Sequence, residues 1–138
     1  MSKRETILAR MVSVLAGTTQ VGSRIYRSRV TPIMRGESPA LVVEPVSDTA
    51  TQDTLGTLQW QMTVRVAVIV RSETPDQAAD AIVADVHSKL MSDATLGGYV
   101  TDLLPSTTSF ELLEADQPAG VVSMEFAVTY RTALNSLS

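Results

Sequence analysis

An alternating run of fourteen residues, LQWQMTVRVAVIVR at 58–71, constrains the fold of this chain more than any other feature. Every even position is apolar, from Leu58 and Trp60 to Val70, whereas the odd positions are mainly glutamine, threonine and arginine. Side chains of a β-strand alternate between the two faces of a sheet, so this period of two predicts a strand with one face on a core. Typical strands have about 5 to 6 residues. We therefore expect this one to extend beyond a single small sheet and to serve a neighbouring copy of the same chain.

Length and composition indicate a single folded unit. The chain has 138 residues, of which 44% are hydrophobic and 19% charged, as in ordinary globular proteins. One domain over 1–138 can bury roughly two thirds of its unfolded surface without metals or disulfides. The chain contains no cysteine, so it offers no disulfide framework, thiolate zinc site or cysteine nucleophile.

No segment has the pattern of a targeting or membrane element. Glu5, Arg10 and Ser13 interrupt the apolar part of the N-terminal stretch, which is therefore unlike a signal peptide. No run approaches the ~20 apolar residues that a membrane-spanning helix requires. We expect a soluble protein with no membrane partner.

Two amphipathic helices are predicted from apolar spacing. Residues 4–16 carry apolar side chains three and four positions apart, and Gly17 follows where a C-cap would lie. The second helix lies within 72–93, with Thr74 as N-cap and Pro75 at the first helical position. Its apolar stripe consists of Ala79, Ile82, Val83, Val86 and Leu90.

Several further segments are expected to be extended. Pro45 cannot donate a hydrogen bond to a sheet, so it belongs late in a strand or on a sheet edge. The extended segments are a short strand or arm at 20–32, a strand at 39–46, a short strand or turn at 96–105, and strands at 106–116 and 119–132.

The segment 47–57 is polar and small, with no large apolar side chain before Leu55. Structureless loops of about a dozen residues are uncommon in compact domains and are usually functional or disordered. We predict a long mobile loop here, including Asp48, Gln52 and Asp53, which orders on contact with a partner.

The order helix, strands, helix, strands indicates an α+β fold. Consecutive strands with short connections favour antiparallel pairing, and two amphipathic helices suffice to cover one face. We predict a mixed, mainly antiparallel β-sheet with two amphipathic helices packed on one face. The core beneath the helices is expected to contain Trp60, Met62, Val64, Met124, Phe126 and Val128.

Residues suited to catalysis are scarce. His87 is the only histidine, and without cysteine it lacks the nitrogen or sulfur partners that zinc sites normally require. No G-x-S-x-G surrounds a serine, and neither the dinucleotide-binding nor the P-loop glycine spacing occurs. Carboxylate pairs such as Glu111 and Glu114 are best explained as solvated charge. We predict no enzyme activity, no cofactor and no metal.

Charge is distributed unevenly along the chain. The net charge of −4 is the wrong sign for a protein that grips nucleic acid over a broad face. Arg24, Arg27, Arg29 and Arg35 nevertheless lie within twelve residues. Guanidinium groups suit phosphate or carboxylate partners, so either DNA or an acidic segment of an adjacent subunit would fit. A solvated strand edge, protected by charge from unwanted pairing, explains them equally well.

Five segments together resemble the tail terminator proteins of long-tailed bacteriophages, the family that includes minor tail protein U. They are RETILARMVSVLAG near the N-terminus, RIYRSRVTP, PALVVEPV, the long alternating run, and the closing PAGVVSMEFAVTYRT. The resemblance covers nearly the whole chain. It rests on the order of elements and on the closing V-x-x-x-F-x-V-x-Y-R-T pattern, and not on a catalytic signature.

The resemblance implies an α+β subunit of a hexameric ring in the virion, at the junction of tail and head, assembled in the host cytoplasm. The ring would cap the finished tail tube, stop its polymerisation and offer a surface for head attachment. Its partners would be further copies of itself, the major tail tube protein and the neck or connector proteins of the head. DNA would only pass through the central hole, and an acidic subunit suits that passage because a lumen that bound phosphate strongly would retain DNA.

The expected contact surface follows from charge and from the second face of the long strand. We place the subunit or tail-tube interface at Arg24, Arg27, Arg29, Arg35, Arg65, Ile69 and Arg71. Two other interpretations stay open: a neck or tail completion protein on the head side, and a small α+β ligand-binding regulatory module.

Overall fold

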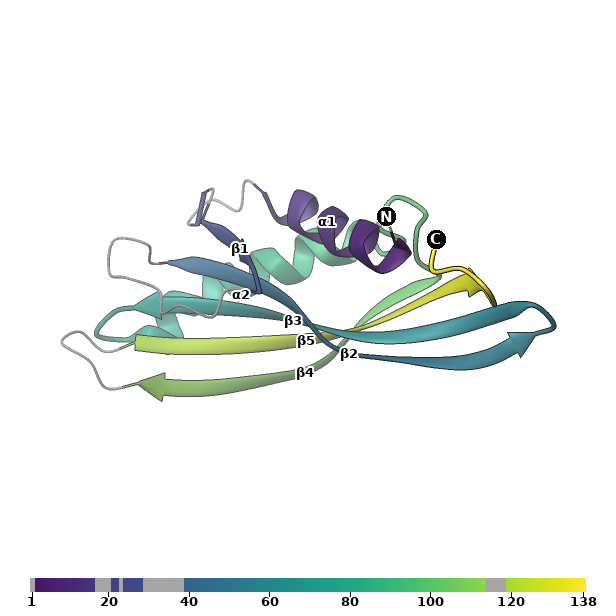
Figure 1. Ribbon diagram of the computed structural model, residues 1–138. Coiled ribbons are helices and arrows are strands. Elements are labelled where there is room, and N and C mark those ends of the chain that lie inside the picture. The colour runs from purple at the N-terminus through teal and green to yellow at the C-terminus, as the bar shows by residue number, and fades with distance from the viewer. Residues whose placement is uncertain (1, 17–20, 23, 29–38, 114–118) are drawn as a thin grey trace.

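The computed structural model describes residues 2–16, 21–22, 24–28, 39–113 and 119–138. Within these residues the chain forms two helices and five strands (Figure 1). In order they are α1 (Lys3–Leu15), β1 (Ile25–Arg27), β2 (Ala40–Thr54), β3 (Thr57–Arg71), α2 (Pro75–Met91), β4 (Asp102–Leu113) and β5 (Ala119–Ala133).

The five strands form one sheet in the order β1-β2-β3-β5-β4. Strand β1 is parallel to β2, and the other neighbouring pairs are antiparallel. Both helices lie on the same face of the sheet, and the other face carries no helix of the described residues (Figure 1). The predicted α+β fold, with a mixed and mainly antiparallel sheet, is therefore confirmed.

The two helices begin as their sequences predict. The Ser2 hydroxyl caps α1 by accepting a 3.2 Å hydrogen bond from the Glu5 backbone N–H. Helix α2 follows Thr74 with Pro75 in its first turn, although the Thr74 side chain makes no capping hydrogen bond. Gly17, the expected C-cap of α1, lies outside the described residues.

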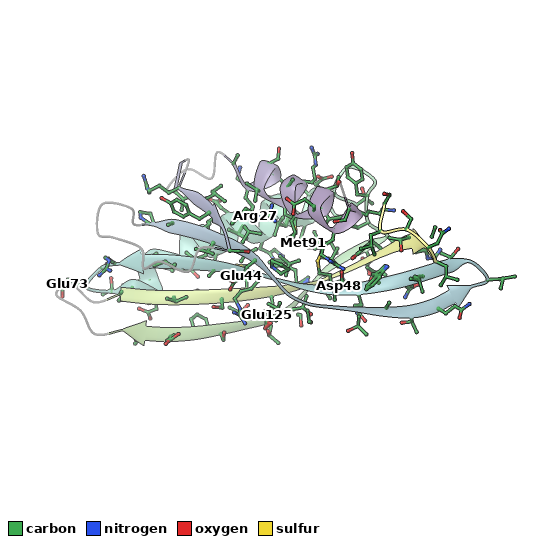
Figure 2. The ribbon with its side chains drawn as sticks, viewed as in Figure 1. Arg27, Glu44, Asp48, Glu73, Met91 and Glu125 are labelled. Atoms are coloured by element: carbon green, nitrogen blue, oxygen red, sulfur yellow. The ribbon has the colours of Figure 1, made fainter. Side chains whose placement is uncertain are left out.

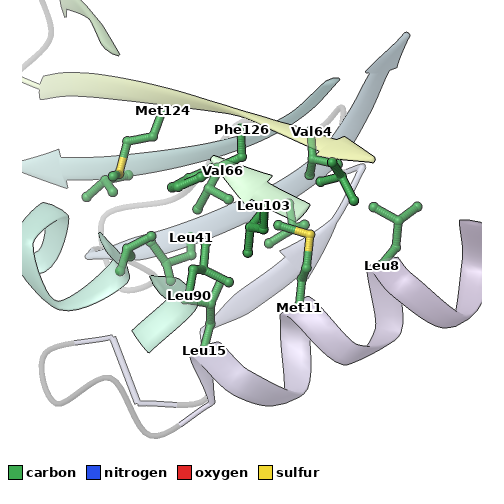
Figure 3. Close-up of a cluster of buried hydrophobic side chains, with 14 of the residues drawn as sticks. Leu8, Met11, Leu15, Leu41, Val64, Val66, Leu90, Leu103, Met124 and Phe126 are labelled. Carbon is green, nitrogen blue, oxygen red and sulfur yellow. The ribbon is translucent and has the colours of Figure 1, made fainter. Parts of the chain in front are cut away.

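The main core fills the space between the helices and the sheet (Figure 3). The even positions of β3 point into it, as the alternation predicts, and Met62, Val64 and Val66 are fully buried. Phe126 and Tyr130 of β5 lie on the same side. Burial of a large apolar side chain stabilises the fold by about 1.5 to 3 kcal/mol, so this alternating strand provides a large share of the driving force.

The prediction of a loop at 47–57 is wrong. Strand β2 continues to Thr54, and only Leu55 and Gly56 form the turn before β3 begins at Thr57. Backbone pairing, which does not depend on side-chain polarity, extends through this segment in register with β3. Gly56 provides the positive φ of +85° at the turn. Asp48, Gln52 and Asp53 are therefore strand residues.

Together β2 and β3 form a long hairpin that extends beyond both helices (Figure 1). We call residues 48–62, which pair from Asp48 with Met62 to the turn, the arm. Strand β1 pairs only with residues 41–43 of β2. The outer edge of β2 therefore has no neighbouring strand beyond that point in the described residues, which agrees with the edge position predicted for Pro45.

Each of the two outer long strands contains a bulge next to a proline. In β2 the register shifts between Pro45 and Ser47, and in β4 it shifts between Pro105 and Thr107. One extra residue in a strand reverses the face to which all later side chains point. Despite its bulge, β4 is a single strand from Asp102 to Leu113. The sequence predicted two separate segments there, at 96–105 and 106–116.

Candidate assembly surfaces

The predicted arginine group is divided between the two faces of the sheet. Arg27 in β1 forms a two-pronged ion pair with Glu5 of α1, with both N–O distances at 3.0 Å. This contact lies on the helix side and lowers the pKa of the Glu5 carboxyl. Arg24 donates from Nε to the carbonyl oxygen of Pro39 at 2.8 Å. Both arginines therefore have partners within their own subunit.

The other predicted interface residues lie elsewhere. Arg65, Ile69 and Arg71 occupy odd positions of β3, whose side chains face away from the helices. Arg29 and Arg35 lie outside the described residues. A shared interface for the whole group stays a prediction.

A row of polar side chains crosses the helix-free face. Arg65 stands opposite Glu44 in β2 and opposite Glu125 in β5, and it forms a 3.2 Å ion pair with Glu44. Glu125 in turn accepts a 3.2 Å hydrogen bond from the Thr107 hydroxyl of β4. Figure 2 labels both glutamates, and their register with Arg65 places them on the same face. The row links all four long strands and leaves its groups at least partly exposed to a partner.

Apolar groups also occur on this face. Ala40, Val42 and Ala67 are buried there, although no helix covers them. Partly buried Tyr26, Ile69 and Val121 pack against these three residues. Ile69, which the sequence places at an interface, is thus part of a small apolar cluster on the helix-free face.

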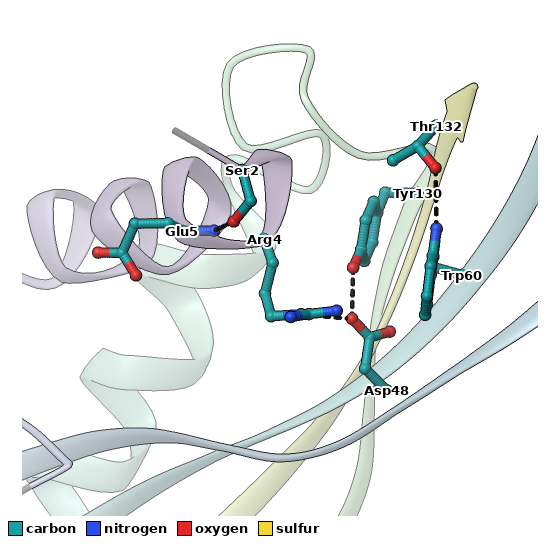
Figure 4. A network of polar contacts seen from close by, with 7 residues as sticks. All are labelled: Ser2, Arg4, Glu5, Asp48, Trp60, Tyr130 and Thr132. Atoms are coloured by element: carbon teal, nitrogen blue, oxygen red, sulfur yellow. Dashed lines mark hydrogen bonds and ion pairs between the residues drawn. The ribbon is translucent and has the colours of Figure 1, made fainter. Parts of the chain in front are cut away.

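A second polar cluster, which sequence reasoning missed, joins α1 to the arm (Figure 4). Arg4 donates from Nε to Oδ2 of Asp48 at 2.7 Å, and the Tyr130 hydroxyl donates to the same oxygen. The Asp48 side chain is only 11% exposed. Burial, and then the hydrogen bond to Asp48, raise the pKa of the Tyr130 hydroxyl. Asp48 is thus a fixed structural group.

The same cluster continues through the aromatic rings. The Trp60 ring is stacked on Tyr130 with ring centroids 6.2 Å apart, and the Arg4 guanidinium lies 5.7 Å from the Trp60 ring centroid. The indole Nε1–H of Trp60 donates to the Thr132 hydroxyl at 2.9 Å. These contacts hold the base of the arm against β5 and the start of α1.

At the opposite end of the sheet, the first turn of α2 and the end of β4 border an open pocket of about 460 Å³. Its apolar lining includes Phe110 and Leu112, which are 71% and 72% exposed. Acidic residues of the lining are Glu73, Asp76 and Glu111. The sequence predicted a strand in this segment, but it did not indicate that β4 lies at the edge of the sheet, where Phe110 and Leu112 are exposed.

The tip of the arm is also apolar and unprotected. Leu55 is 96% exposed in the turn, and Leu134, directly after β5, is 55% exposed. The Leu134 backbone N–H donates to the Gly56 carbonyl oxygen at 2.9 Å, which places the two leucines at the same end of the molecule.

Chemical sites are not evident in the described part of the chain. No group of three or more histidine, cysteine, aspartate or glutamate side chains suited to a metal occurs among those residues. His87 is an exposed residue of α2. No helix among the described residues has both the length and the apolar content to cross a membrane.

Comparison with known proteins identifies a family and shows that the fold occurs among solved structures. Residues 2–130 match the sequence model of the family described as phage minor tail protein U. No curated protein sequence matches the chain significantly. Among solved structures, a chain from the virion of a native gene transfer agent particle has a TM-score of 0.63 at 17% identity. That match covers 95% of this chain and 92% of the other, and it supports the fold.

Proposed function

Since the chain belongs to the phage minor tail protein U family, we propose that it is the terminator of a long phage tail. Copies of the chain close into a hexameric ring on the end of the tail tube and stop further addition of tube subunits. The exposed side of the ring then receives the neck or connector proteins of the head, and DNA passes through the central hole.

Family membership establishes the broader role. A minor tail protein is a structural component of the phage tail, so this chain belongs to the virion. The similarity of its fold to a chain of a virion particle agrees with that role. Ring formation, the number of subunits and the passage of DNA are the parts that we add.

The helix-free face of the sheet is the observation that carries the proposal. An antiparallel sheet can leave one face without helices when that face is largely polar. Among the described residues this face carries mainly threonine, glutamine, serine and alanine, together with the small apolar cluster around Ile69. Its row of Glu44, Arg65, Glu125 and Thr107 offers donors and acceptors over the full width of the sheet. Such a surface suits contact with other protein subunits and requires no reactive pocket.

The negative net charge of the chain also agrees with a ring through which DNA passes. A net charge of −4 does not favour tight binding of phosphate, so passing DNA is not retained. We assign Arg65 and Ile69 on the helix-free face to protein contacts with a neighbouring subunit or the tail tube.

Removal of the gene from its phage tests the proposal. Loss of a terminator gives tails of variable and excessive length without heads, and the chain supplied in trans restores a single tail length in electron micrographs. Tails of normal length that fail to join heads would identify a head-side completion protein instead.

Paired variants test the surface itself. Ala127→Lys places a charge on the helix-free face, where Ala127 is opposite Thr63, and should abolish restoration of tail length. Ala84→Lys adds the same charge at an exposed position of α2 and should restore tails normally. Equal activity of the two variants would show that the helix-free face is not the assembly surface.

A further inference from the structure

Two exposed apolar features lie at opposite ends of the sheet. Strand β5 starts at Ala119 beside the pocket and ends at Ala133, which pairs with Thr57 at the arm's turn. At about 3.3 Å per residue, the fifteen residues of β5 separate the two ends by roughly 45 Å. Figure 2 shows Glu73 at one end of the molecule and the arm at the other. A single subunit therefore cannot bring them into contact.

Their shapes are complementary. At the arm's end, Leu55 projects from a two-residue turn with nearly all of its surface in water. At the other end, Phe110 and Leu112 line a pocket whose volume is sufficient for an apolar side chain. Large apolar groups this exposed are common at protein contacts, because their burial there is favourable.

The charge around the pocket has one sign. The pocket is lined by Glu73, Asp76 and Glu111, and its described lining contains no cation. Contact between two copies of this end would bring like charges together, so the acidic lining disfavours a pocket-to-pocket arrangement.

We infer that the arm's tip of one subunit, with Leu55 at its centre, docks in the α2–β4 pocket of the next copy. The contact is heterologous, because two different surfaces of the same chain meet, and repetition of such a contact generates a ring when the rotation closes. This inference rests on the proposed ring and adds a contact between the ends of neighbouring copies to the contacts assigned to the helix-free face.

Pairing of the free strand edges is the main competing geometry, and the structure disfavours it. The exposed edge of β2 carries Pro45 and a bulge, and that of β4 carries Pro105 and a bulge. Prolines and bulges interrupt the hydrogen-bond ladder that a neighbouring strand would need. Contact between the ends of the molecule meets no such obstacle.

Disulfide trapping tests the contact directly, because the chain has no cysteine of its own. Leu55→Cys combined with Leu112→Cys, incorporated into tails and oxidised, should give a ladder of linked copies on a non-reducing gel. An intramolecular bond is impossible across the length of the sheet, since disulfides need Cα atoms within about 7 Å. The matched control is Leu55→Cys with Ser109→Cys, whose second position lies on the same strand but on the helix-free face.

The pattern of ladders decides the result. A ladder from the first pair and none from the control supports the contact. The contact would be overturned if the double variant capped tails at normal length and yet gave no ladder. It would also be overturned by a ladder from both pairs, or by a bond to another tail protein. Each of these outcomes would leave the terminator role intact. If even the unmodified chain fails to restore tail length, the proposed function itself is wrong.

Charge at the tip gives a second test that does not depend on trapping. Leu55→Asp brings a carboxylate to an acidic pocket and should reduce the number of capped tails by ~10-fold or more, as expected for loss of a central anchor. Leu55→Lys also removes the leucine, but it should retain more activity because its ammonium suits the carboxylates. Equal urea midpoints would show that both variants fold, and equal capping by the two would overturn the inference.

Discussion

The Arg4 guanidinium contacts the Asp48 carboxylate at 2.7 Å and thereby fastens the first turn of α1 to the base of the arm. Tyr130 donates its hydroxyl proton to the same carboxylate oxygen, so a helix and two strands meet at one group. The direction of the arm relative to the helices depends on this junction, and a contact made by the arm's tip depends on that direction.

Removal of the Arg4 side-chain charge should destabilise the fold. In Arg4→Met, the largely buried Asp48 carboxylate keeps only its bond from Tyr130, and the loss should be about 1 to 3 kcal/mol in urea unfolding. Arg27→Met breaks an ion pair at the surface and should have a much smaller effect. An equal loss in both variants would show that the junction is no more important than a surface pair.

Alkaline pH should weaken the fold through Tyr130. Burial and Asp48 raise the pKa of its hydroxyl in the folded protein, whereas tyrosine in the unfolded chain titrates near 10. Above about pH 10 the unfolded state loses a proton that the folded state keeps, so this contribution to stability, fully present at lower pH, declines.

Comparison with Tyr130→Phe isolates that contribution. The difference in unfolding free energy between the unmodified protein and Tyr130→Phe should shrink as the pH rises from about 9 to about 11. A constant difference over this range would mean that the Tyr130 hydroxyl does not titrate differently in the two states.

Trp60 should report on the junction because it is the only tryptophan in the chain. Thr132→Val keeps the side-chain shape but removes the acceptor for the indole N–H, and should cost about 1 kcal/mol while shifting the Trp60 emission. Thr129→Val, at a partly buried position of the same strand, is the control. An unchanged emission spectrum in Thr132→Val would contradict the hydrogen bond.

Gly120→Ala should disturb the pocket. A Cβ at this position would lie 2.6 Å from the Cβ of Pro75, which is closer than packed atoms allow. We expect a loss of about 1 to 3 kcal/mol from this overpacking. The loss should fall clearly when Gly120→Ala is combined with Pro75→Gly, and additive costs in this double-mutant cycle would argue against the close approach.

Much of the fold is visible in the sequence because local and long-range signals agree. Strand β3 alternates throughout, and both helices have an apolar stripe that matches their buried face. The segment 47–57 was predicted wrongly because it contains few apolar residues, so its threonines and aspartates have the composition of a loop. Its strand conformation comes from pairing with β3, which the composition of the segment does not indicate.

The candidate surfaces were less predictable, because they depend on partners distant in sequence. Arg27 looked available until the fold placed it beside Glu5, and Asp48 looked mobile until Arg4 and Tyr130 enclosed it. The exposure of Phe110 follows from the edge position of β4, which strand order alone determines.

The bulge beside Pro45 limits how the arm can vary in related chains. Beyond it, Asp48 must keep facing α1, and addition of a single residue would turn that carboxylate to the other side of the sheet. Residues inserted between Asp48 and the turn do not change the direction of the Asp48 side chain. Side chains nearer the turn keep their original face only when an even number of residues is added to each of the two strands. The span from junction to tip is therefore adjustable in increments of about 7 Å, and tails of different girth would require arms that differ by such steps.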